Sequence, residues 1–212
     1  MGLVLIHGDM VERIPTITTI NGIEYKLTTA IQKLNNKISA LLSLPDTIKV
    51  KLFLSSSLKS VAPFMGLNQL PEYPDKLKAI VDGLNVKNYQ KLEYAYIDPS
   101  TEPTQEPSWK KYNPMHLQWP ALSDGKIQAG EGTIGLIMEY GEKIKEIPLL
   151  SVLRLPIVGT QYNLADIDDM EHVIDDNLET LVDINQDLGY LSDHGTLNIS
   201  GASPMGQRNP DE

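Results

Sequence analysis

The stretch Ile48-Lys49-Val50-Lys51-Leu52-Phe53-Leu54 alternates apolar residues with lysines, which is the pattern of a half-buried strand. Apolar residues at helical spacing follow over residues 72–84, and residues 92–96 alternate again in a strand that ends at Asp98-Pro99. A strand, a helix and a strand in this order form the crossover unit that places two parallel strands side by side. The sequence therefore predicts an α/β fold with a mixed sheet.

One hairpin pattern occurs twice, because residues 2–15 align without a gap on residues 135–148. Each segment contains a strand, a Gly-acid turn and a second alternating strand closed by proline, which predicts a repeated β-hairpin. The first hairpin precedes an amphipathic helix predicted over residues 22–44. Its outer edge is open to two interpretations: it pairs within its own chain, or it adds to a neighbouring molecule as a homo-oligomer.

Further apolar residues at helical spacing predict a helix at about 170–187 in the acidic part of the chain. The tail beyond it is rich in Gly, Ser, Pro and Asn, which is typical of a disordered terminus. We therefore divide the chain into a hairpin plus long helix (1–45), an α/β domain (46–150), an acidic helical extension (151–196) and a tail (197–212).

The net charge of −10 arises from 18 Lys+Arg and 28 Asp+Glu. Residues 155–207 hold ten of the acids and no Lys or Arg, whereas the preceding part is nearly neutral. Such a chain lacks the basic surface that holds a polyanion, which argues against nucleic acid as a partner. Three interpretations of the acidic segment stay open: a solvated face, a cation site, or a surface for a basic partner formed by Asp175, Asp176, Glu179 and Asp183.

Catalytic and cofactor motifs are missing from the sequence. The chain has no cysteine, which excludes thiol redox chemistry, and it has neither a phosphate-binding loop nor a serine nucleophile elbow. The calcium loop motif fails because Glu171 stands where glycine is needed, and the four histidines have no zinc-site spacing. Ser55-Ser56-Ser57 reads as a turn at a strand end. We expect no enzyme activity, cofactor or metal.

Aromatic residues stand between the five prolines of residues 98–131, where no long regular element is expected. Trp109, Tyr112 and Trp119 either pin an ordered excursion to the body of the protein or form a loop that contacts a ligand or partner.

The order of these elements resembles the periplasmic region of the GldG-like auxiliary components of ABC transporters, a gliding-motility group related to an intraflagellar transport family. The resemblance is carried by the strand–helix–strand unit and by these segments: 22–34, 96–99, 135–141, 146–150 and 189–195. The resemblance implies a thioredoxin-like domain outside the cytoplasm, tethered to the inner membrane by segments outside this sequence, with permease and ATPase subunits as partners. The group's Gly-His-Gly-Glu appears as Asp193-His194-Gly195-Thr196, which leaves the role of this turn open.

The leading hypothesis is therefore a non-catalytic, periplasmic auxiliary module that acts through protein or solute contacts. A second hypothesis is a soluble periplasmic sugar-binding protein whose three aromatic rings stack on the solute. A third is a hydrolase on a flavodoxin-like scaffold, which requires Ser, His and acid side chains to converge in a cleft.

Overall fold

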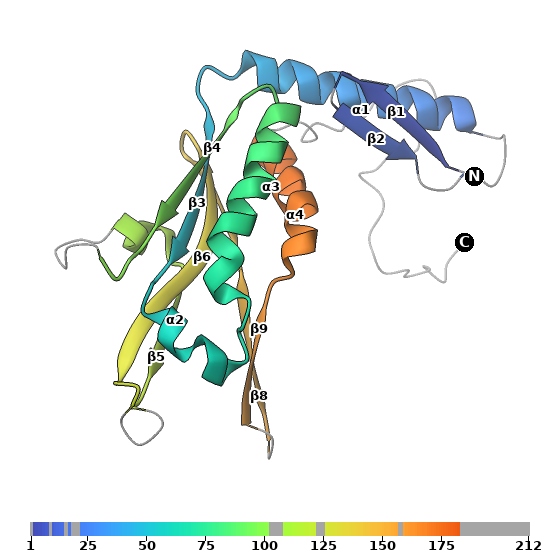
Figure 1. Ribbon diagram of the computed structural model, residues 1–212. Helices are drawn as coiled ribbons and strands as arrows, with labels where there is room; N and C mark the ends of the chain where they lie inside the picture. Colours follow the sequence, from blue (N-terminus) through green and yellow to red (C-terminus); the bar gives the residue numbers. More distant parts are fainter. Residues whose placement is uncertain are drawn as a thin grey trace, which may run out of the picture.

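The protein has a mixed α/β fold, and the described part of the chain forms one five-stranded sheet and two separate two-stranded sheets (Figure 1). The computed structural model describes the following residues: 2–8, 10–14, 17, 22–101, 108–121, 126–156 and 159–182.

Strand β3 (Ile48–Leu54) lies inside the five-stranded sheet. It runs parallel to β4 (Leu92–Ile97) and antiparallel to β6 (Gly130–Tyr140). Consecutive parts of β6 also pair with β5 (Met115–Trp119) and β7 (Lys143–Ile147), both antiparallel. The predicted mixed sheet with a parallel pair is therefore confirmed, and β6 and β7 pair antiparallel. β5 lies in the proline-rich stretch, and its short strand was not predicted.

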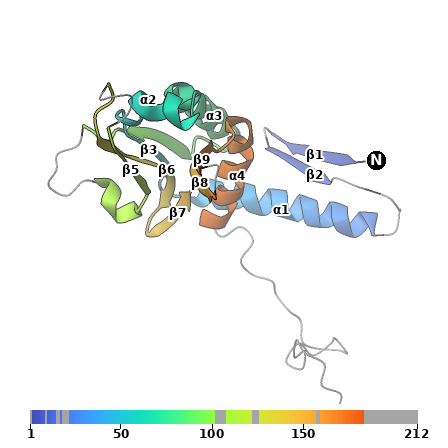
Figure 2. The same ribbon diagram turned by 90° about the horizontal axis from the view of Figure 1, so that it is seen from below.

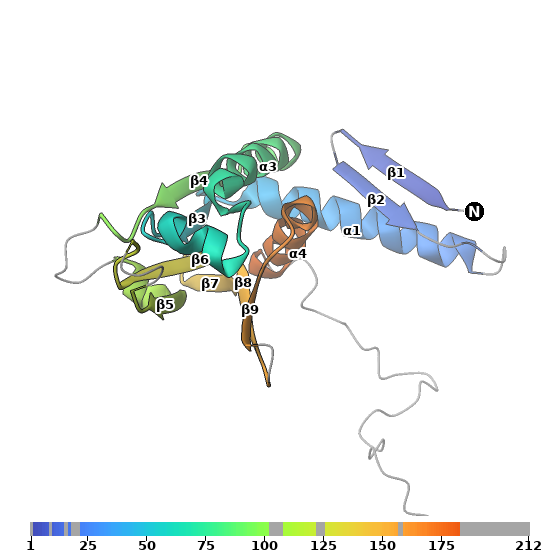
Figure 3. The ribbon, with the colours of Figure 1, turned by 60° about the horizontal axis from the view of Figure 1, so that its bottom comes forward.

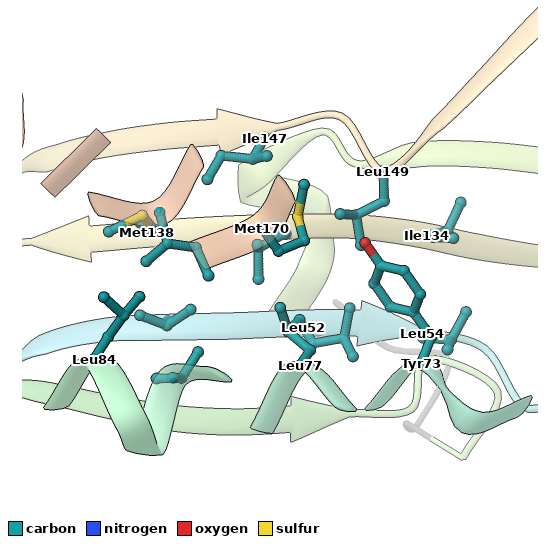
Figure 4. Packing of buried hydrophobic residues seen from close by; sticks show 14 of the residues in the cluster. Leu52, Leu54, Tyr73, Leu77, Leu84, Ile134, Met138, Ile147, Leu149 and Met170 are labelled. Carbon is teal, nitrogen blue, oxygen red and sulfur yellow. The ribbon is translucent and has the colours of Figure 1, made fainter. Parts of the chain in front are cut away.

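Two helices cover one face of this sheet (Figures 1 and 2). Helix α3 (Tyr73–Lys87) is the crossover between β3 and β4, and α4 (Met170–Leu181) packs against α3, β6 and β7. Both are amphipathic, so their apolar stripes bury against the strands. Figure 4 shows Leu77 of α3 and Met170 of α4 meeting Leu52 and Met138 of the sheet. Both predicted helices are thus confirmed, although the structure describes α4 only to Leu181.

Short helical pieces complete the connections. Helix α2 (Leu58–Val61) and two 3-10 turns, 62–65 and 70–72, lead from β3 to α3. A third 3-10 turn, η3 (Ser108–Tyr112), lies on the opposite face of the sheet, and a fourth, η4 (Ile167–Asp169), precedes α4.

The N-terminal unit consists of strands β1 (Leu3–His7) and β2 (Met10–Ile14), an antiparallel pair, and the long helix α1 (Ile23–Ser43). In each of the two aligned segments, the two strands pair antiparallel. Met10 and the buried side of α1 belong to the same buried cluster as residues of the sheet and of α4. The three predicted segments thus pack around one core as far as the structure describes them. None of the described helices is long and apolar enough to cross a lipid bilayer.

Strands β8 (Leu150–Leu155) and β9 (Gly159–Leu164) form an antiparallel hairpin that was not predicted. Figure 3 shows this hairpin projecting away from the sheet and helices. Its base is fixed by buried Leu149 and Leu150 and by the hydrogen bond from the Ala165 amide to the Leu149 carbonyl, 2.7 Å. We refer to residues 150–164 as the β8–β9 arm.

The hydroxyl group of Tyr73 is buried without a hydrogen-bond partner and points toward Leu149 (Figure 4). Burial, with a smaller effect of the Asp166 charge, raises the pKa of Tyr73 to about 12.

Removing an unsatisfied buried hydroxyl eliminates a desolvation cost. We expect Tyr73→Phe to raise the free energy of unfolding by about 1 kcal/mol in urea denaturation. Tyr94→Phe is the matched control, because it removes a bond from the Tyr94 hydroxyl to the Pro74 carbonyl (3.1 Å) and should destabilise. Equal effects of the two substitutions would contradict this interpretation.

Candidate functional site

The carboxyl ends of the parallel strands β3 and β4, where α/β proteins commonly bind ligands, are occupied here by a hydrogen-bonded turn. Asp98 Oδ1 accepts hydrogen bonds from the amides of Ser56 and Ser100, both at 2.9 Å. Ser57 Oγ donates to the Glu131 carbonyl at 2.7 Å. Partial burial works to raise the pKa of Asp98, but the bonds from Ser56 and Ser100 outweigh it and lower that pKa. The serine run is therefore a strand-end turn, as predicted.

The three predicted aromatic residues do not share a pocket among the described residues. Trp119 is buried in the main core, and its Nε1 donates to the Gln128 carbonyl at 3.2 Å. Tyr112 is buried on the other face of the sheet against Phe53. Trp109 is partly buried beside Tyr112 and stacks on His116, with ring centroids 5.8 Å apart. These contacts pin the excursion to the body, and two of the three rings are inaccessible for stacking on a solute.

Tyr112 also closes a polar cluster on that face. Its hydroxyl donates to Glu139 Oε2 at 2.8 Å and lies 2.7 Å from Lys51 Nζ, which itself forms an ion pair with Glu139. Lys111 Nζ reaches Glu139 Oε1 at 3.1 Å. Partial burial tends to raise the pKa of Glu139, but the hydrogen bonds from Lys51, Tyr112 and Lys111 outweigh it and lower the pKa to about 2. The sheet thus carries a charged pair that holds the η3 segment in place.

The predicted acidic partner surface is largely turned toward the N-terminal helix. Lys37 Nζ of α1 donates to Asp175 Oδ2 at 2.7 Å and to Glu179 Oε1 at 3.2 Å. Asp176 is on the exposed side and lies 3.5 Å from His172. Asp183 lies outside the described residues. Two of the four acids, Asp175 and Glu179, therefore join α4 to α1.

A groove of about 690 Å³ lies between β2, α1, α3 and α4. Residues of both charge signs line it, and several pair across it: Lys33 with Glu12 at 3.7 Å and Glu179 at 3.4 Å, and Lys87 with Glu171. The groove therefore has a mixed, mutually compensated charge. It is a seam between the N-terminal unit and the helices, with no single sign of charge to attract an ionic ligand.

Groups suited to catalysis do not converge in the described part of the chain. There, no three His, Asp or Glu side chains gather as metal ligands, and no histidine hydrogen-bonds to a serine. His116 contacts Thr133 and Glu131, and His172 contacts Asp176. His194 and the turn around it lie outside the described residues.

Two features of the structure were not predicted from the sequence: the β8–β9 arm and the ion pair between Lys51 and Glu139. Pro156 and Gly159 between two stretches of alternating residues indicate a hairpin at the β8–β9 arm. This hairpin was not predicted, because the acidic segment was interpreted as helical. The link between Lys51 and Glu139 had no local signal, since the two residues are 88 positions apart in the chain.

Comparison with known proteins gives no relative: no family model, curated protein or solved structure matches this chain.

The lowered pKa of Glu139 predicts a pH dependence of stability. Because this pKa lies below the ordinary 4.5, ionised Glu139 stabilises the folded state above pH 4.5, and this contribution is lost as the pH falls through about 2. We expect Glu139→Gln to lower the free energy of unfolding by about 1–2 kcal/mol above pH 4.5, with the difference from wild type shrinking toward pH 2. Tyr112→Phe should give a smaller loss. Denaturation curves at a series of pH values test this, and parallel stability profiles for wild type and Glu139→Gln would refute it.

Two neighbouring aspartates on α4 provide a matched test of the link to α1. The Asp175 side chain is 33% exposed and pairs with buried Lys37, whereas the Asp176 side chain is 62% exposed and its charge partner in the described residues is His172. We expect Asp175→Asn to lower the free energy of unfolding by about 1–2 kcal/mol and Asp176→Asn by less than about 0.5 kcal/mol. Urea denaturation of both variants checks this prediction. Equal losses would show that the Lys37 contact contributes nothing specific.

Proposed function

We propose that this chain is a non-catalytic auxiliary module of an ABC transport system, acting outside the cytoplasm by binding other subunits of the system. The location, the tether to the inner membrane and the permease and ATPase partners come from the resemblance to the GldG-like components. The thioredoxin-like interpretation is supported by the β3–α3–β4 unit followed by the β6–β7 hairpin and α4, with both helices on one face of the sheet.

The β8–β9 arm is the observation that carries the interaction role. Its strands hydrogen-bond to each other and to no other strand in the described residues. Leu153 and Leu155 expose large apolar side chains on it, next to exposed Arg154. A projecting two-stranded hairpin is only marginally stable by itself in water, and it does not shield such side chains. Exposed apolar residues on a projecting element are typical of a protein-binding surface.

The polar clusters support a binding role in another way. Glu139, Asp98 and Asp175 each hold elements of the fold together through the hydrogen bonds described above. Their side chains make structural contacts, and among the described residues none of the three hydrogen-bonds to a histidine. The sugar-binding alternative is not carried forward, because the rings of Tyr112 and Trp119 are buried in separate clusters. The hydrolase alternative has no converging side chains in the described residues to support it.

Photo-crosslinking in living cells tests the proposal. With p-benzoylphenylalanine at position 153 of the full-length protein, we expect light-dependent crosslinks to a permease or ATPase subunit, identified by mass spectrometry. The control places the same residue at Lys78, an exposed position on α3. Leu153→Asp combined with Leu155→Asp should lower co-purification of that subunit about tenfold, which corresponds to roughly 1.4 kcal/mol of binding. Crosslinks to no transporter subunit, or equal yields at positions 153 and 78, would reject the proposal.

A further inference from the structure

The N-terminal hairpin has an open edge and an uncovered face. Strand β1 pairs with β2 and with no other strand in the described residues. On the side of the hairpin away from α1, Val4, Ile6 and Val11 are 57%, 70% and 50% exposed. Ile6 stands opposite Val11 in the register and Val4 stands opposite exposed Arg13, so this face carries three apolar side chains and one arginine. Figure 3 shows β1 as the strand of this pair that lies farther from α1.

The hairpin of the same sequence pattern shows what such an edge can accept. In the gapless alignment β1 corresponds to β6, with Val4 at the position of Ile137 and Ile6 at that of Glu139. The edge of β6 that corresponds to the open edge of β1 is paired with β3, antiparallel, over six residues. Ile137 is fully buried in a cluster with Phe53 and Tyr112. The helix contact is common to both hairpins, since α1 packs on β2 as α4 packs on β7.

The hydrogen-bonding groups at this edge can be assigned from the ladder. The pair His7–Met10 closes a two-residue turn, so His7, Leu5 and Leu3 direct their backbone groups toward β2. The backbone N–H and C=O groups of Val4 and Ile6 therefore point to the open edge. Edge strands are normally protected by charged residues, proline or a bulge. Leu3-Val4-Leu5-Ile6-His7 contains no proline, lysine or acid, and its pairing with β2 is continuous.

We propose that β1 pairs antiparallel with β1 of a second copy of this chain, centred on Leu5. The two hairpins then form one four-stranded sheet with the order β2-β1-β1-β2. In this register Leu5 faces Leu5 of the other copy, and Val4 faces Ile6, so apolar side chains lie opposite each other on the exposed face of β1. Val4 and Ile6 exchange the backbone hydrogen bonds that the open edge leaves unused.

The side chains favour a second copy over a strand with the composition of β3. In the five-stranded sheet, Lys49 of β3 stands opposite Glu139, and Lys51 opposite Ile137. A strand of that kind on β1 would place a lysine opposite Ile6, whose side chain has no charge to pair with it. A second β1 places Val4 there instead. Apolar Ile6 therefore favours pairing with an uncharged strand, such as β1 of a second copy.

Multi-angle light scattering and sedimentation equilibrium of the purified chain test the proposal. We expect a concentration-dependent dimer with twice the mass of one chain, in which the amides of Val4 and Ile6 are protected from hydrogen exchange. Ile6→Lys places a charge on the paired strand and should give a monomer. Val11→Lys adds the same charge to the same face, but on β2, and should leave the dimer. Circular dichroism confirms that both variants fold.

Three results would overturn the inference: a wild-type monomer at all concentrations, equal loss of the dimer in Ile6→Lys and Val11→Lys, or a dimer whose Val4 and Ile6 amides exchange freely. Equal loss would indicate stacking of the exposed faces and not pairing of the edges. A monomer would show that the open edge of β1 does not pair with a second copy of the chain. The dimer does not depend on the proposed function, since the crosslinks from position 153 report on a different hairpin.

Discussion

The burial of β3 between a parallel and an antiparallel neighbour is the constraint on which the rest of the structure depends. Its alternate residues Val50 and Leu52 face α3 and α4, whereas Lys51 and Phe53 face the η3 segment. A shift of one residue in register would exchange these two sets, putting lysines into the core and leucines on the other face. Lys51 is accommodated because Glu139 and Tyr112 supply its charge partner and a hydrogen bond. Two faces of different chemistry thus determine one register for the sheet.

The parts of the fold that the sequence predicted are those whose pattern is local. The strand at Ile48, the helices ending near Ser43 and Lys87 and both hairpins have apolar residues at the spacing of their own element. β5 and β8–β9 were not predicted, because β5 lies among prolines and the acidic stretch that contains β9 was interpreted as helical. Their strand conformation depends on pairing with another segment, which single-sequence patterns do not reveal.

The candidate site was less predictable than the fold, for the same physical reason. The sequence shows Glu179 among like charges on a helix, which indicates repulsion and solvent exposure. In the structure, lysines of α1 lie beside Glu179 and Asp175, and Lys37 is 138 residues away from Asp175 in the chain. Because these lysines pair with the acids, the acidic face of α4 forms the contact between α4 and α1. Only the tertiary structure brings these charges together, and no count of acids along the chain contains that information.

The β1–β2 and β6–β7 hairpins share some features that depend on their sequence pattern and differ in others that depend on the neighbouring strands. The shared pattern of strand, Gly-acid turn and strand produces the same two-stranded ladder in both places. The side chain on the outer face then differs with the environment: Glu139 faces the lysines of β3 and η3, whereas Ile6 lies exposed on a strand with one neighbour. A charged residue at position 6 would have protected the open edge against pairing. Because Ile6 is apolar, the open edge and the exposed face of β1 are both suited to pairing with an uncharged strand.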